Sequence, residues 1–269
     1  MINNRVLTVV EDLERTLVEF IRKHRVTHAE YRAATDLIIA EVQAGEMSLL
    51  FDVFLEAAAT DVGNQDREGS VEAIEGPFYL PGAPWLEGPR HVLPQRPDEA
   101  GIPLVFHGQV TTEAGKPLAG VELDLWNADA KGLYSQIHPG IPDWNLRGRF
   151  RSDDEGRFEV RTIVPPPYEI PKDGPTGTVL NALGRHFFRP AHLHVKLRHP
   201  HFGERTSQLY FEGGPYLDSD VANAVRTELV ITAQLVEDPE LTARYGLDVP
   251  FVEARYDFVF APSPAVSDG

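Results

Sequence analysis

The chain has 269 residues, of which 42% are hydrophobic and 25% charged, an ordinary composition for a globular protein. Its formal net charge of −16 at pH 7 argues against a nucleic-acid binder, because neutralising phosphates requires clustered Lys and Arg. The sequence contains no cysteine, which excludes disulfides, thiolate metal sites and cysteine nucleophiles. Any bound metal must therefore take nitrogen and oxygen ligands.

The N-terminal part of the chain predicts three helices. Apolar residues recur every three or four positions over 5–24, and Thr27 with Glu30 forms a capping box for a second helix that ends at Gly45. The third helix, over 48–60, is apolar nearly all round, so we expect both of its sides to be buried, one of them against a partner subunit or as the roof of a pocket. No apolar run is long enough to span a bilayer and no signal peptide is recognisable, so the expected location is the cytoplasm.

After a polar linker at 64–69, the sequence changes character. Prolines and glycines are dense over 75–97, which predicts an ordered but irregular segment. From residue 103, alternating apolar and polar residues separated by Gly and Pro turns predict antiparallel strands, at 103–110, 121–126, 157–164, 191–198, 207–211 and 252–260. A further helix is expected within 218–235, packing back on the helical part.

The expected fold class is therefore α+β. A helical dimerisation and linker domain (1–72) precedes a catalytic domain (73–269) built as an antiparallel β-sandwich. No internal repeat is apparent.

Two histidines stand two residues apart in the predicted strand over 191–198. Because side chains alternate along a strand, His192 and His194 share one face and can bind a metal together. A strand with two partly exposed histidines is the other interpretation of a bare His-x-His pair.

Two tyrosines stand in unusual settings. Tyr168 lies among four prolines, which restrict its backbone, and Tyr134 follows the strand that ends at Trp126. Taken alone, each tyrosine is more simply explained by packing. Two imidazoles and two phenols nevertheless make a coherent donor set, and two phenolates favour a hard ion of high charge such as Fe(III).

Two further polar residues are candidates for the same site. Arg189, three residues before His192, could stabilise an oxyanion, and Gln208 could donate a hydrogen bond into the cavity if neighbouring strands pair. Two alternatives remain open at this point: a metal-binding β-sandwich module, and a zinc hydrolase that uses the Glu169 carboxylate as general base.

The chain resembles the intradiol ring-cleaving dioxygenases, and most closely the catechol 1,2-dioxygenase branch. The resemblance extends over nearly the whole length and rests on several motifs in addition to the helical N-terminus: Ile74-Glu-Gly-Pro-Phe-Tyr79, Gly120-Val-Glu-Leu-Asp-Leu-Trp126, Leu146-Arg-Gly-Arg149, Pro167-Tyr-Glu-Ile-Pro171, Gly184-Arg-His186 and Arg189-Pro-Ala-His-Leu-His194. It implies one non-haem Fe(III) per subunit, held by Tyr134, Tyr168, His192 and His194, with Arg189 and Gln208 as catalytic helpers and Tyr168 also acting as a base. It also implies a homodimer formed through the N-terminal helices, with a phospholipid at the dimer interface.

The resemblance further implies the reaction and the substrate pocket. Both atoms of O2 enter catechol, and the ring opens between the two hydroxylated carbons to give cis,cis-muconate. Chlorocatechol, methylcatechol and hydroxyquinol are alternative substrates. The pocket wall is expected from eight residues: Leu49, Asp52, Val53, Ile74, Gly76, Pro77, Phe78 and Ala222. Chlorocatechol-cleaving relatives tend to carry a cysteine where this chain has Ala222, which favours catechol or methylcatechol.

Overall fold

The structure is a computed structural model that describes residues 4–46, 49–65, 67–88 and 90–261. The chain divides into two compact units, Met1–Met47 and Ser48–Gly269. The predicted domain boundary at residue 72 therefore remains a prediction. No helix in the described part of the chain is both long enough and apolar enough to cross a membrane.

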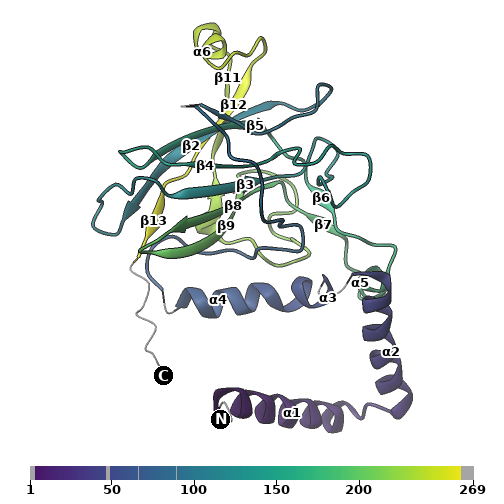
Figure 1. Cartoon of the computed structure of the whole chain (residues 1–269). Helices are drawn as coiled ribbons and strands as arrows, with labels where there is room; N and C mark the ends of the chain where they lie inside the picture. The colour runs from purple at the N-terminus through teal and green to yellow at the C-terminus, as the bar shows by residue number, and fades with distance from the viewer. Residues whose placement is uncertain (1–3, 47–48, 66, 89, 262–269) are drawn as a thin grey trace. The chain divides into compact units, whose positions relative to one another are not determined.

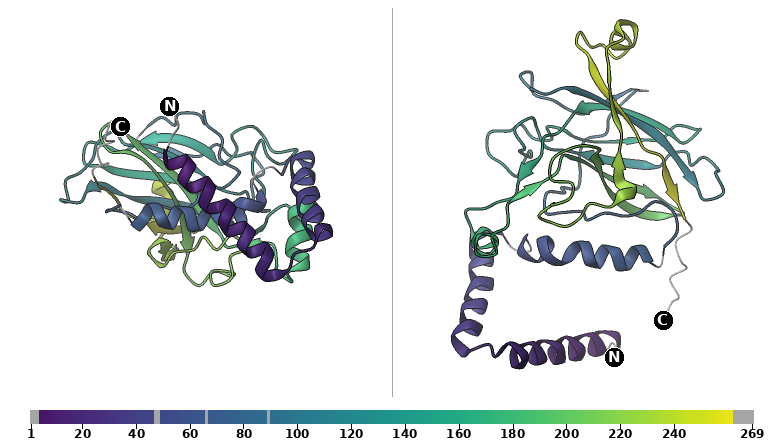
Figure 2. Two further views of the ribbon diagram at one scale, coloured as in Figure 1. Left: turned by 90° about the horizontal axis from the view of Figure 1, so that it is seen from below. Right: turned by 180° about the vertical axis from the view of Figure 1, so that it is seen from behind.

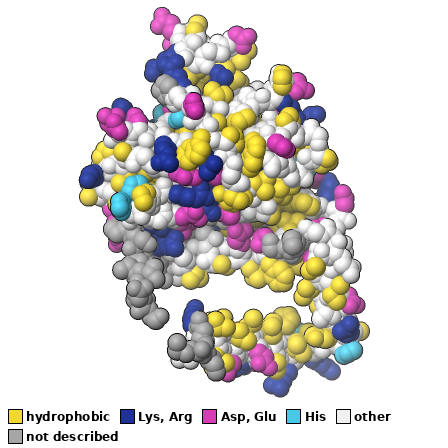
Figure 3. All heavy atoms as spheres, in the orientation of Figure 1, with side chains coloured by type: hydrophobic (Ala, Val, Ile, Leu, Met, Phe, Trp, Pro, Cys, Tyr) yellow, Lys and Arg dark blue, Asp and Glu magenta, His cyan; other side chains and the backbone are white. Residues whose placement is uncertain are grey.

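The first unit consists of two helices, α1 (Asn4–His24) and α2 (His28–Ala44). The predicted capping box is present: Glu30 N donates to Thr27 Oγ1, and the Glu30 carboxylate accepts from Thr27 N. Gly45 ends α2 with a left-handed backbone, as expected. No side chain of α1 is buried, and Figure 3 shows apolar side chains gathered along this helix.

The second unit begins with a helical stretch that differs from the prediction. It comprises α3 (Leu49–Phe51), a π-helical turn η1 (Asp52–Glu56) and α4 (Ala57–Gln65), so it extends into the predicted linker. Leu49 and Val53 are buried within the chain, whereas Phe51 is 48% and Leu55 57% exposed in the single chain, so burial of that second side remains a prediction. Residue 48, where the helix was expected to begin, lies outside the described residues.

Strands outnumber helices in the second unit, and the predicted α+β class of the chain and the β-sandwich of this unit are confirmed (Figures 1 and 2). The strands are β1 (His91–Val92), β2 (Pro103–Thr112), β3 (Glu122–Trp126), β4 (Arg147–Arg151), β5 (Arg157–Ile163), β6 (Tyr168–Glu169), β7 (Phe188–Arg189), β8 (His192–His199), β9 (Gly203–Phe211), β10 (Val230–Ile231), β11 (Ala233–Val236), β12 (Phe251–Arg255) and β13 (Phe258–Phe260). Three short helices lie between them: α5 (Pro175–Ala182), the 3-10 turn η2 (Thr227–Leu229) and α6 (Pro239–Arg244). Figure 1 and the right-hand view of Figure 2 show α6 beyond the ends of β11 and β12, remote from α4.

The strands form two main sheets and a small ribbon. One sheet has the order β1-β5-β2-β12-β11 with β13 also paired to β2, the other has the order β10-β9-β8-β3-β4, and β6 pairs with β7. Most neighbours are antiparallel, but β1–β5, β10–β9, β12–β2 and β13–β2 are parallel. The predicted strand over 252–260 is interrupted and becomes β12 and β13.

The helix expected within 218–235 is a wrong prediction. That stretch contains a turn, η2, β10 and β11 instead. Asp220 accepts hydrogen bonds from the backbone of Ala222 and Ala224, and Asn223 has a left-handed φ of 50°, both of which divert the chain from a helix. The β-branched residues that follow favour strands.

The hydrophobic core lies between the two main sheets, and the side chains that do not point into it lie on the opposite face of each sheet. Leu125 pairs with Val195 across β3 and β8, and both are fully buried in this core. Their neighbours Trp126 and His194 also pair and, because side chains alternate, point to the opposite face. The irregular segment over 73–79 and the start of the helical stretch cover that face, where a second apolar cluster includes Leu49, Phe78, Trp126, Tyr134 and Tyr168.

Candidate metal centre

The two histidines project from β8 toward the covered face of the five-stranded sheet. Their Nε2 atoms are 3.0 Å apart, and both side chains are at most 2% exposed. The Pro190 carbonyl lies 2.7 Å from His192 Nδ1 and accepts a hydrogen bond from the tautomer protonated there, which has its lone pair on Nε2. The indole of Trp126 stacks on His194 at 4.5 Å between ring centroids and fixes that ring. Two imidazole nitrogens therefore converge on one point.

The two tyrosines complete a ring of four aromatic side chains. Tyr134 and Tyr168 lie edge to face with centroids 5.4 Å apart, Tyr134 lies 6.2 Å from His194, and Tyr168 lies 5.6 Å from His192. Tyr134 is 1% and Tyr168 6% exposed. The structure thus brings together all four predicted metal ligands.

Each tyrosine is held by its local structure. Tyr168 pairs with Arg189 across β6 and β7, so the proline-framed segment is tied to the strand that leads into the histidines. Tyr134 N donates to His138 Nδ1 at 3.0 Å, and the Arg147 guanidinium lies over the Tyr134 ring at 5.7 Å. Among the described residues, the buried Tyr134 Oη has no hydrogen-bond partner. A buried hydroxyl without a partner is unusual in a native structure, and such an oxygen fits the role of a metal ligand.

The site is electrostatically suited to a cation with phenolate and imidazole ligands. Burial, reinforced by the Arg189 charge, lowers the pKa of His192 to about 3, and burial also holds the pKa of His194 far below its usual value. Both rings are therefore neutral, as metal ligands must be. Burial raises the pKa of the Tyr134 phenol well above its usual value and raises the pKa of Tyr168 as well, so these phenols ionise only where positive charge compensates.

The donor set depends on tyrosine. Within the described ranges, no three His, Cys, Asp or Glu side chains are grouped so that they could hold a metal ion. Glu169, the general base of the zinc-hydrolase alternative, is exposed and bonded to Lys172, on the opposite side of β6 from Tyr168. The two phenols and two imidazoles fit a hard ion of high charge such as Fe(III).

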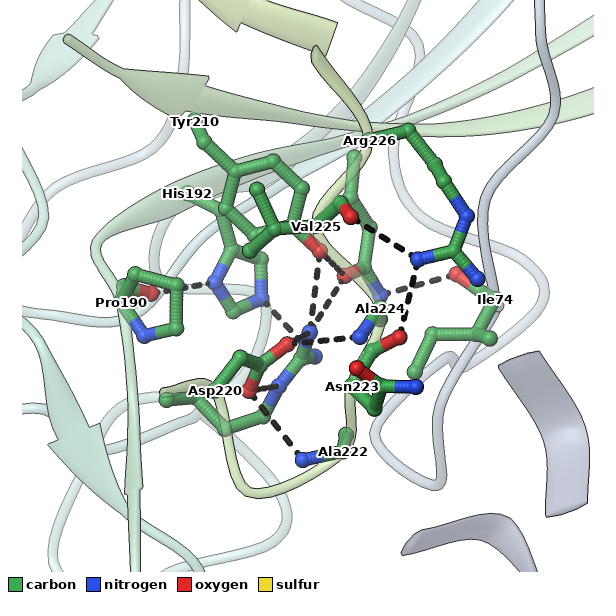
Figure 4. Close-up of polar contacts among 12 residues, drawn as sticks. Ile74, Pro190, His192, Tyr210, Asp220, Ala222, Asn223, Ala224, Val225 and Arg226 are labelled. Carbon is green, nitrogen blue, oxygen red and sulfur yellow. Dashed lines mark hydrogen bonds and ion pairs between the residues drawn. The ribbon is translucent and has the colours of Figure 1, made fainter. Parts of the chain in front are cut away.

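Arg189 is buried beside the histidines in a network that the sequence predicted only in part. Its Nη2 donates to Gln208 Oε1 at 2.8 Å, and its Nε and Nη2 each contact the Asp220 carboxylate at 3.0 Å. Gln208 pairs with His194 across β8 and β9, so the strand pairing needed to bring it into the site is confirmed. Tyr210 Oη completes the network by donating to Gln208 Oε1 at 2.6 Å (Figure 4).

Asp220 and Tyr210 were missed by sequence reasoning. Tyr210 stands two residues after Gln208 on the same strand, so strand alternation could have placed both on one face. Asp220 was assigned to the start of a helix, and nothing in its local sequence links it to Arg189, 31 positions earlier. Figure 4 shows Asp220 beside His192 and Tyr210.

A cavity adjoins two of the four aromatic side chains, Tyr168 and His194. It is lined by all eight residues expected to form the pocket, together with Glu56, Tyr168, Ile170, Arg189 and His194. Tyr134 does not line it, so the two tyrosines differ in their access to whatever the cavity holds. Glu56 and Ile170 were not predicted.

Comparisons with known proteins agree with this fold. A family model described as "Catechol dioxygenase N terminus" matches residues 3–70, and one described as "Dioxygenase" matches residues 74–262. Chlorocatechol 1,2-dioxygenase of Rhodococcus opacus is 39% identical over 88% of this chain and 93% of the relative. Catechol 1,2-dioxygenase of Pseudomonas sp. strain EST1001 is 33% identical over 95% and 85%.

A solved structure gives the same result. The crystal structure of 3-chlorocatechol 1,2-dioxygenase from Rhodococcus opacus 1CP has a TM-score of 0.87 and 42% identity, and the match covers 97% of this chain and 99% of that one. Fold and sequence define an oxidoreductase that uses O2. The chain belongs to the intradiol dioxygenase family. Its activity is intradiol 1,2-cleavage in the catabolism of aromatic compounds.

Proposed function

We propose that the protein cleaves catechol between its two hydroxylated carbons to give cis,cis-muconate, using Fe(III) held by Tyr134, Tyr168, His192 and His194. The observation that carries this proposal is the convergence of two phenols and two neutral imidazoles beside a cavity, with Tyr134 Oη left without a partner among the described residues. When bound, a ferric ion would supply Lewis-acid chemistry: it would draw electron density from the substrate and make the ring reactive toward O2.

The residues of the chain divide the remaining work. Tyr168 lines the cavity, so its phenolate oxygen is the base that takes up one of the two hydroxyl protons of catechol. Arg189 also lines the cavity and stabilises negative charge on the substrate oxygens. Gln208 and Asp220 accept hydrogen bonds from its guanidinium, which keeps that group in position before the substrate binds.

The pocket wall is assigned to the eight residues that were expected to form it, all of which line the cavity. Most of them are apolar, the kind of lining that binding sites for aromatic rings have. Chlorocatechol is the second candidate substrate, because several relatives with 36–42% identity are named chlorocatechol 1,2-dioxygenases. Methylcatechol and hydroxyquinol complete the panel to be tested.

The decisive experiment is a visible absorption spectrum of the purified protein, before and after anaerobic addition of catechol. Phenolate-to-Fe(III) charge transfer gives a reddish band that shifts when substrate binds. Adding O2 should then consume one O2 per catechol and release muconate. A colourless protein with full metal content would reject the ferric site, and a kcat/KM panel over the four catechols would identify the substrate.

We also propose that the protein is a homodimer formed through α1 and α2, with a phospholipid between the subunits. The support is the exposed apolar face of α1, where Val6, Leu13 and Phe20 are each more than half exposed. Light scattering after size exclusion should give twice the 30.0 kDa chain mass. Mass spectrometry of an organic extract should detect the lipid.

A further inference from the structure

The irregular segment over 73–76 forms a thin wall between two hollows. Ile74 and Gly76 line the candidate substrate cavity, whereas Ala73 and Glu75 line a groove on the other side, next to α4 and β9. A Cβ at Gly76 would lie 3.9 Å from both Gln208 Nε2 and His194 Cε1, so the backbone here faces the candidate metal centre. A shift of this wall would change the volume of the cavity next to the candidate metal centre.

Glu56 holds this wall from the helical side. It lines both hollows, and its Oε1 accepts hydrogen bonds from Glu75 N at 3.0 Å and from Gly76 N at 3.4 Å. From the sheet side, Gln208 Nε2 donates to Ile74 O at 2.8 Å. Three backbone groups of the wall are thus hydrogen-bonded: Gln208 binds Ile74 O, and Glu56 binds Glu75 N and Gly76 N.

The carboxyl group of Glu56 serves as an acceptor rather than as a paired charge. Its Oε2 is buried and has no hydrogen-bond partner within the described chain. Burial raises the pKa of this carboxyl and the Asp52 charge adds to the effect, while the two backbone N–H groups and Arg189 oppose it. A buried carboxylate without a compensating charge is unfavourable, so the negative charge of Glu56 is not what stabilises this arrangement. We infer that the role of Glu56 is to place Oε1 as a hydrogen-bond acceptor for the two backbone N–H groups.

We propose that Glu56 is a positioning residue that fixes the cavity wall, and so determines which ring substituents fit and where Gln208 is held. This rests on the proposed function, since it concerns the substrate of that same cavity. The link runs from Glu56 through the Glu75–Gly76 backbone and the Ile74 carbonyl to Gln208, which contacts Arg189. A neutral amide can supply the same acceptor as the carboxyl.

The test compares Glu56→Ala and Glu56→Gln in the iron-loaded enzyme, with Glu75→Gln as matched control. Glu75 has its carboxylate on the groove side, paired with Lys196, so the control removes a nearby acid but keeps the wall's hydrogen bonds. Hydrogen exchange of a peptide spanning residues 73–78 should be at least tenfold faster in Glu56→Ala. It should be near wild type in Glu56→Gln and in the control.

Kinetics provide the second measurement. The measured quantity is the KM for 4-substituted catechols divided by the KM for catechol. This ratio should differ about tenfold between Glu56→Ala and wild type, with a smaller effect on kcat. Glu56→Gln should have the wild-type ratio. If Glu56→Ala does not fold, Glu56→Asp, with an acceptor one methylene short, should show intermediate exchange.

Two results would overturn the proposal. One is unchanged exchange of the wall in Glu56→Ala, or in Glu56→Asp if the alanine variant does not fold, and the other is a Glu56→Gln variant that exchanges as fast as the alanine variant. Hydrogen exchange does not depend on turnover, so a failure of the proposed substrate would leave this part of the test intact.

Discussion

Gly132 and Tyr168 approach each other so closely that a Cβ built on Gly132 would lie 2.7 Å from the Tyr168 Cβ. Gly132 also has a φ of 80°, a conformation that L-residues with side chains rarely adopt. It belongs to the turn that leads to Tyr134, so one glycine allows the two candidate phenolate ligands to come together. The separation of the tyrosines therefore depends on a residue that carries no functional group.

Gly132→Ala should destabilise the protein and disturb the candidate metal centre. Backbone strain and the clash with Tyr168 together should lower the free energy of unfolding by roughly 2–4 kcal/mol, measured by urea denaturation. Iron content should fall as well. Gly115→Ala is the matched control, since Gly115 has a φ of 72° but nothing within 4 Å of its Cβ position. Equal losses in the two variants would show that strain alone, and not the Tyr168 contact, explains the effect.

The buried pair of Arg189 and Asp220 should be essential to stability as well as to activity. Both side chains are at most 4% exposed, and Asp220 is the carboxylate that compensates the guanidinium. Asp220→Asn keeps the shape but leaves Arg189 uncompensated, which should lower the free energy of unfolding by about 3 kcal/mol.

The control for Asp220→Asn is Asp61→Asn, which breaks a partly exposed pair with Arg226 and should cost less than about 1 kcal/mol. Urea unfolding of both variants at pH 7 is the measurement. A smaller loss in Asp220→Asn than in Asp61→Asn would contradict the assigned role of Asp220.

The sequence predicted the strands that hold the histidines because alternation with period two is a local signal. It also proposed Tyr134, Tyr168, His192 and His194 as metal ligands, although each tyrosine alone had a simpler explanation in packing. Their convergence depends on the β6–β7 and β3–β8 registers, which pair residues more than 20 positions apart. Local patterns contain no information about such registers. The chemistry of the four side chains suggested one donor set, and the resemblance to a family added their assignment as ligands of a single ion.

The errors have the opposite cause, because tertiary contacts overrode local preference. The stretch after Asp218 was expected to be a helix. Instead, the Asp220 carboxylate accepts hydrogen bonds from the backbone of its own turn and from the Arg189 guanidinium. Glu56 was missed because its partners are backbone N–H groups, which every sequence contains.

Asp124 should make the stability of the protein depend on pH. Burial raises the pKa of this carboxyl to about 6, although the Tyr79 hydroxyl and Arg198 oppose the shift. A folded-state pKa above the unfolded value near 3.9 means that this contribution to stability is fully present below about pH 4 and is lost as the pH rises through about 6. Asp124→Asn keeps an acceptor for Tyr79 Oη and removes the titration.

The measurement is the difference in free energy of unfolding between Asp124→Asn and wild type, from urea titrations at pH 4.5, 6 and 7.5. The free energy of unfolding of the variant minus that of wild type should increase with pH, by roughly 1–2 kcal/mol between pH 4.5 and pH 7.5. Asp154→Asn, at an exposed position, should show no such trend. A difference that stays constant over this range would show that Asp124 is not the titrating group.

Tyr168→Phe should separate metal binding from catalysis. Tyr168 lines the cavity and Tyr134 does not, so loss of the Tyr168 hydroxyl removes the proposed base, while three of the four proposed ligands remain. We expect kcat to fall about 100-fold or more, in the range that general-base catalysis contributes, while iron content falls by a smaller factor. Tyr134→Phe should instead lower iron content and activity together. Tyr245→Phe, remote from the site and bonded to Glu159, is the control for loss of a phenol. Unchanged turnover in Tyr168→Phe at full iron loading would remove Tyr168 from the proposed mechanism.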